Sequence, residues 1–186
     1  MRITPALQPL VNALAPHFVA LDGRRIRVRF QPALTASRGK LLSNAEYGRP
    51  VHAASFIRKR ELILESELRA HPRELSRVFT HELFHFVWAR LGNTTRASYD
   101  RLIREELRAR ARGELGWSAQ HLKAALKTTG QHRSWRVYIC ESFCDTAAYL
   151  YAECDHHHQE FTLSKKWRTR RETWFRESFA NRVLSI

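Results

Sequence analysis

His81, Glu82 and His85 form the pattern His-Glu-x-x-His, whose residue types can bind a metal ion and activate water. Residues four apart lie on one face of a helix, so the two imidazoles can hold one ion. Glu82 can then reach a water molecule bound to that ion. Positions 78–87 carry no other charge and no proline. Burying unpaired imidazoles and carboxylates is costly, so an apolar helix that contains them favours a metal site over two incidental histidines.

Glu141 and Asp145 form a second pair with the same four-residue spacing, among apolar and small residues of a helix predicted at 135–153. Two carboxylates on one buried face resist ionisation unless a cation lies between them. A metal ion and a histidine ligand together satisfy both carboxylates. The alternative is an exposed acidic pair on an amphipathic helix.

Residues 78–87 resemble the active-site helix of the zincin metallopeptidases and match that family's extended pattern throughout. Glu141 and Asp145 resemble the Glu-x-x-x-Asp motif of the thermolysin-like branch, the gluzincins. The resemblance covers residues 51–153. The spacing from His85 to Glu141 is longer than in thermolysin, and the chain is shorter, so it looks more like the minimal single-domain gluzincins.

The resemblance implies a zinc metalloendopeptidase that holds one zinc ion. His81, His85 and Glu141 would be the zinc ligands, and Asp145 would hydrogen-bond His81 and fix its tautomer. Glu82 would act as the general base toward a zinc-activated water. The expected substrate is a peptide or protein.

Two further site assignments follow from the resemblance. In zincins the strand shortly before the active-site helix is usually an edge strand that binds extended peptide through its backbone. Here that role would fall to Leu62, Ile63, Leu64 and Glu65. Such sites also use a Tyr, His or Arg to stabilise the oxyanion. Tyr138, three residues before Glu141, is the first candidate, and Tyr149 is the second.

The order of elements predicts an α+β fold, in which a small N-terminal antiparallel sheet packs on a mainly helical, zincin-like core. The 186 residues fit a single domain over residues 1–186. Periodicity predicts strands at 26–30, 51–57 and 61–66, and helices at 4–21, 72–91, 96–112, 118–127, 135–153 and 164–184. Residues 32–50 read as a loop. We expect the final helix, within residues 164–186, to dock on the core through its aromatic face.

The chain is strongly basic, with a net charge of +14 from 32 Lys and Arg against 18 Asp and Glu. This balance favours acidic substrates, nucleic acid or an anionic membrane, or else a solvated basic surface. It supports two rival functions: a DNA-associated protease like the SprT family, or a non-catalytic zincin-like protein that binds nucleic acid. SprT-like proteases use a third histidine, and the surroundings of His121 do not match that family's pattern.

Other features of the sequence bear on where in the cell the protein is located. No secretory signal and no run of about 18 apolar residues is present, so no transmembrane helix is expected. Three cysteines, two of them on one predicted helix, favour a reducing, cytoplasmic location. The run His156–His158 can capture a second metal, although an exposed loop is the simpler interpretation.

Overall fold

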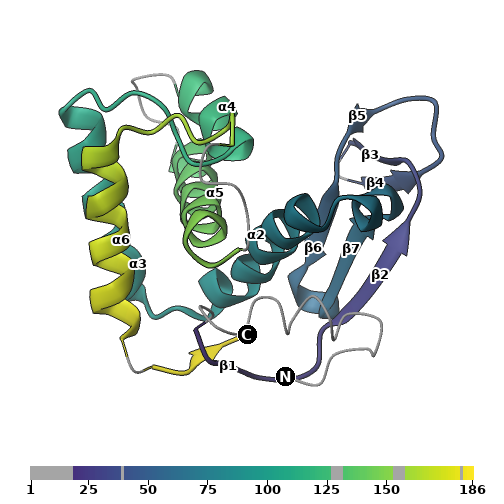
Figure 1. Ribbon diagram of the computed structural model, residues 1–186, viewed down its shortest axis with the longest axis horizontal. Coiled ribbons are helices and arrows are strands. Elements are labelled where there is room, and N and C mark those ends of the chain that lie inside the picture. The colour runs from purple at the N-terminus through teal and green to yellow at the C-terminus, as the bar shows by residue number, and fades with distance from the viewer. Residues whose placement is uncertain (1–18, 39, 127–131, 153–157, 181) are drawn as a thin grey trace.

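The computed structural model has an α+β fold in which helix α2 (Pro72–Arg90) separates a sheet from a group of helices (Figure 1). The structure describes residues 19–38, 40–126, 132–152, 158–180 and 182–186. The predicted α+β class is confirmed. The helix predicted at 4–21 lies almost entirely outside the described residues. No helix among the described residues is long and apolar enough to cross a membrane.

The larger sheet has three strands in the order β2 (Arg27–Gln31), β7 (Glu61–Glu65), β6 (Ala53–Phe56). The hairpin β6–β7 is antiparallel, as predicted, whereas β2 pairs with β7 in parallel. The predicted small antiparallel sheet is therefore present at the hairpin, and β2 adds a parallel strand to it. The chain between β2 and β6 forms a separate small sheet and returns before the hairpin, which lets β2 and β7 run in the same direction. Leu62 and Leu64 on β7 are fully buried.

The loop predicted at 32–50 is also wrong, because this segment forms a second antiparallel sheet. Its strands are β3 (Leu34–Ser37), β4 (Lys40–Ser43) and β5 (Arg49–Pro50), in the order β4-β3-β5. Strands of two to four residues are too short to show an alternating pattern. A two-stranded parallel pair, β1 (Leu21–Asp22) with β8 (Leu184–Ser185), joins the two ends of the described chain.

The motif helix α2 begins with Pro72 in its first turn and ends beside Leu91, close to the predicted bounds. The other helices are α3 (Asn93–Arg108), α4 (Trp117–Ala125), α5 (His132–Tyr151) and α6 (Lys165–Phe179). Helix α5 begins at His132, before the predicted start at residue 135. Helix α6 docks on the core as expected, with Phe175 and Phe179 buried, but it ends before residue 184.

A buried group of charges, here called the Arg171 cluster, joins α3, α4, α5 and α6. Arg171 is fully buried and pairs with Glu106 at 2.7 Å and with Glu114 at 2.8 Å. Lys123 Nζ lies 3.0 Å from Glu114 Oε1, and the Tyr138 hydroxyl donates to the same oxygen at 2.5 Å. Because α4 and α5 also carry the candidate site described below, this cluster fixes the helices that position it.

We expect the Arg171 cluster to make the fold acid-sensitive. Burial alone would raise the pKa of Glu114, but the charges of Arg171 and Lys123 hold it below its usual value of 4.5. A depressed carboxyl pKa contributes stability above pH 4.5, and this contribution is lost as the pH falls through the folded-state pKa. Urea unfolding between pH 7 and pH 3 tests this. Below pH 4.5 the free energy of unfolding should fall more steeply for the wild type than for Glu114→Gln; equal slopes contradict the prediction.

Candidate metal centre

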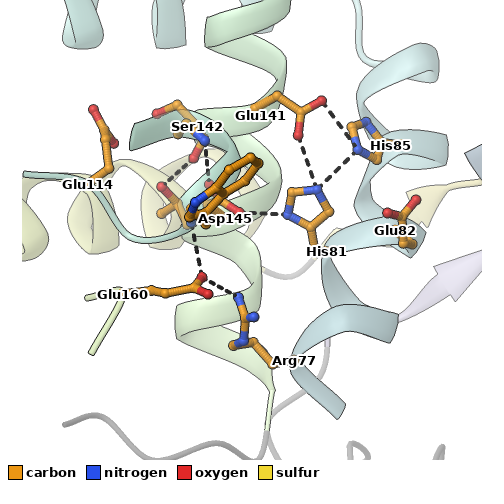
Figure 2. A network of polar contacts seen from close by, with 12 residues as sticks. Arg77, His81, Glu82, His85, Glu114, Glu141, Ser142, Asp145 and Glu160 are labelled. Carbon is orange, nitrogen blue, oxygen red and sulfur yellow. Dashed lines mark hydrogen bonds and ion pairs between the residues drawn. The ribbon is translucent and has the colours of Figure 1, made fainter. Parts of the chain in front are cut away.

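Three side chains from two helices bring donor atoms to one point (Figure 2). His81 Nε2 lies 3.2 Å from His85 Nε2 and 3.2 Å from Glu141 Oε2, and His85 Nε2 lies 3.7 Å from Glu141 Oε1. A tetrahedral zinc ion with bonds of about 2.0–2.2 Å separates its ligand atoms by about 3.3–3.6 Å. The observed separations are close to these values. His81, His85 and Glu141 could therefore hold a metal ion, and their spacing is compatible with zinc.

Asp145 holds His81 from the side opposite the three converging atoms. Its Oδ1 lies 2.7 Å from His81 Nδ1, and its Oδ2 accepts a hydrogen bond of 3.0 Å from the backbone N–H of Ala119. Asp145 is only 2% exposed, so water does not compete for these contacts. The contact places the ring proton on Nδ1 and leaves Nε2 free to bind a metal.

The N-terminus of α4 supports one carboxylate of α5 and one of the segment between α5 and α6. The Ser118 hydroxyl hydrogen-bonds Glu141, and the Trp117 backbone N–H donates to Glu160 Oε2 at 3.0 Å. Arg77 on α2 donates to the same Glu160 oxygen at 3.0 Å (Figure 2). A helix N-terminus stabilises negative charge. Sequence spacing gave no signal for Ser118 or Glu160, because each meets its partner only through the tertiary fold.

The ionisable side chains of this site have pKa values that favour positive charge at this point. Burial alone would lower the pKa of His85, but its hydrogen bond with Cys140 and the charge of Glu141 raise it to about 9. Burial alone would raise the pKa of Glu141, but its hydrogen bond with His81 and the charges of both histidines lower it to about 2. Asp145 and Glu141 likewise raise the pKa of His81 against the effect of burial. The Glu141 carboxylate therefore remains ionised and contributes a negative potential at the histidines.

Gly116 allows the chain to pass directly against Asp145. A Cβ atom at Gly116 would lie 2.3 Å from Asp145 Cγ and 2.3 Å from its Oδ1. Its backbone is extended, with φ at 179°, so the steric contact and not the backbone angle demands glycine.

Gly116→Ala is expected to lower zinc affinity about 10–100-fold, because it displaces Asp145 from His81. Competition with a zinc chelator measures this loss, and Gly92→Ala is the matched control, since a Cβ there meets no atom within 4 Å. Equal zinc affinities of the two variants would contradict the role assigned to Gly116.

Glu82 and the three candidate ligands line one cleft of about 580 Å³. The Ser55 hydroxyl on β6 lies 2.5 Å from Glu82 Oε2 and 2.8 Å from the Glu82 backbone carbonyl, and it can donate its single proton to either oxygen. Ser55 thereby holds the Glu82 carboxylate beside the histidines. At the opposite wall, the Arg49 guanidinium lies 4.9 Å from the centre of the exposed Trp117 ring.

The strand beside the cleft is β6, and the predicted substrate strand is therefore wrong. Strand β7, which contains Leu62, Ile63, Leu64 and Glu65, is the central strand, with β2 and β6 on its two edges. Its backbone groups are already paired. Ala53, Ala54 and Ser55 line the cleft instead, and no strand among the described residues pairs with the outer edge of β6.

The predicted catalytic role of Tyr138 is wrong as well. Tyr138 is fully buried, and its hydroxyl donates to Glu114 in the Arg171 cluster rather than to the cleft. Burial and the Glu114 charge raise its pKa. Tyr149 packs edge-on against Phe161 at 5.0 Å and does not line the cleft either. In the run 156–158, residues 156 and 157 lie outside the described residues, and His158 Nε2 lies 3.6 Å from Glu74.

The chain has no significant match among models of known families, curated proteins or solved structures. The resemblance to gluzincins therefore rests on the two motifs in α2 and α5. What the site can do follows from its residues and geometry.

Proposed function

We propose that this protein is a zinc-dependent metalloendopeptidase whose single zinc ion is held by His81, His85 and Glu141. The observation that carries the proposal is the convergence of these three donor groups, at separations that suit zinc, in one cleft with Glu82. Catalytic zinc sites typically use three protein ligands, and His₂Glu is one of the known sets. These three ligands would leave the fourth position of zinc for water or substrate.

Each residue of the site has a defined task in peptide hydrolysis. Zinc, when bound, would act as a Lewis acid and lower the pKa of a coordinated water to about 7. Glu82 takes the proton from the attacking water and transfers it to the leaving amine. Ser55 orients Glu82, and Asp145 orients His81. The backbone of β6 offers its free edge to an extended peptide, and side-chain pockets along the cleft give selectivity.

Two rival functions make different demands on the site. A SprT-like DNA-associated protease needs a third histidine, but the His121 ring stacks on Trp117 at 5.0 Å and belongs to neither group of possible metal ligands among the described residues. The net charge of +14 still favours an acidic or nucleic-acid partner. A non-catalytic zincin-like protein requires no general base, whereas Glu82 here lies in the cleft with a hydrogen-bonded carboxylate.

Zinc content tests the proposed ligand set. Purified wild type is expected to hold one zinc per chain, and Glu141→Ala to lose it, because two imidazoles alone bind zinc weakly. Glu177→Ala, which removes an exposed carboxylate from α6, is the control. Mass spectrometry of the metal after dialysis gives the readout. Equal zinc in wild type and Glu141→Ala excludes Glu141 as a ligand and overturns the gluzincin assignment.

A further inference from the structure

The second ring nitrogen of His85 faces two cysteines of α5. Cys140 Sγ lies 3.4 Å from His85 Nδ1, and Cys144 follows one helical turn later. One donor atom from each of the three residues lies within 4.8 Å of the other two, and both thiols are free. Neither cysteine lines the cleft. The candidate zinc centre uses His85 Nε2, whereas Cys140 Sγ contacts Nδ1 on the other side of the same imidazole.

The donor set selects a soft metal ion. Bonds of about 2.3 Å to sulfur and 2.0–2.1 Å to nitrogen place the two donor atoms about 3.6–3.8 Å apart, close to the observed 3.4 Å. Thiolates prefer soft ions such as Cu(I) and also bind zinc. Zinc in structural sites takes four ligands, whereas this group of described residues supplies three. Cys144 is completely buried, so water has little room to complete a zinc site.

We propose that His85 Nδ1, Cys140 and Cys144 form a second metal site, which binds Cu(I) in three-coordinate geometry. On binding, both thiols release their protons, His85 gives up any proton on Nδ1, and the copper remains Cu(I), so the step needs no oxidant or reductant. The imidazole contributes a lone pair from Nδ1. The proposal is independent of peptide hydrolysis, because none of its sulfur ligands belongs to the proposed zinc centre.

Anaerobic titration with Cu(I) against a chromogenic copper chelator tests the site. The reference protein is the full chain with Cys154→Ser, which leaves only the two cysteines of interest. We expect this reference to bind one Cu(I) per chain. Cys140→Ser and Cys144→Ala should each lower the Cu(I) affinity about 100-fold or more. The run His156–His158 is present in every variant, so any copper that it captures cancels in the comparison.

Glu141→Ala in the same background separates this proposal from the proposed zinc centre. It is expected to lose zinc and to retain its Cu(I) affinity within about threefold, since its cysteines are intact. Thermal unfolding checks that each variant is folded, and Cys140→Ser, at a partly exposed position, decides the result if Cys144→Ala does not fold. The proposal is overturned if the reference binds no Cu(I), or if the folded cysteine variants bind it as tightly as the reference.

Discussion

Replacing Glu82 by Gln is expected to reduce peptide hydrolysis by about 10²–10⁴-fold while leaving one zinc per chain. The amide keeps the size of the carboxylate and can still accept a hydrogen bond from Ser55. It cannot take a proton from water, so the chemical step loses its general base. Because Glu82 is not one of the three converging donors, metal binding should not change.

Hydrolysis of a quenched-fluorescent peptide library, with zinc content measured on the same samples, gives both readouts. Glu67→Gln is the matched control, since Glu67 is exposed and does not line the cleft. A Glu82→Gln variant that remains fully active would disprove the role of Glu82. If it instead loses zinc together with activity, Glu82 acts on the metal and not on the proton.

Replacing Arg171 by Ala is expected to lower the free energy of unfolding by about 3–5 kcal/mol. The change leaves the buried carboxylates of Glu106 and Glu114 without their main partner, and of these two carboxylates Lys123 pairs with Glu114 alone. Removing one partner of a buried ion pair destabilises a fold more than replacing both partners, because the remaining charge stays buried without a partner. Helices α3, α4, α5 and α6 should loosen together.

Urea unfolding monitored by circular dichroism measures this effect. Arg170→Ala is the control on the neighbouring residue, whose half-exposed pair with Glu105 contributes at most about 1 kcal/mol. A double variant, Arg171→Ala with Glu106→Gln, should recover part of the lost stability, because one stranded charge is removed. If Arg171→Ala and Arg170→Ala unfold at the same urea concentration, the buried cluster does not stabilise the fold as described.

The candidate ligands could be predicted because each motif lies within one helix. Within a helix, the four-residue spacing places His81 beside His85 and Glu141 beside Asp145, independently of the tertiary structure. The contact between the two helices depends on the tertiary fold, and the sequence predicted it only through the resemblance to gluzincins. The free edge of the sheet could not be predicted in the same way, since a hairpin pattern does not say which strand a third strand will join.

Tyr138 shows a different limit of sequence reasoning. Its position three residues before Glu141 places it near the correct helical face, but the 60° offset between such positions turns its hydroxyl toward Glu114. Ser55, Gly116 and Ser118 were not identified because their sequence neighbours carry no motif. Ser55 is 27 residues from Glu82, and Gly116 meets Asp145 only where two separate segments cross.

The position of α2 between the sheet and the other helices divides the site into two parts that can change independently. The sheet side supplies Ser55 and the open edge of β6, which would serve turnover in the proposed enzyme, whereas α4 and α5 supply Ser118, Glu141 and Asp145, which would serve metal retention. Variants of the proposed enzyme that lost the sheet contacts would still bind zinc but would not hydrolyse peptides. Those that lost the α5 carboxylates would forfeit both properties at once. The two faces of α2 therefore separate changes that abolish hydrolysis alone from changes that abolish zinc binding as well.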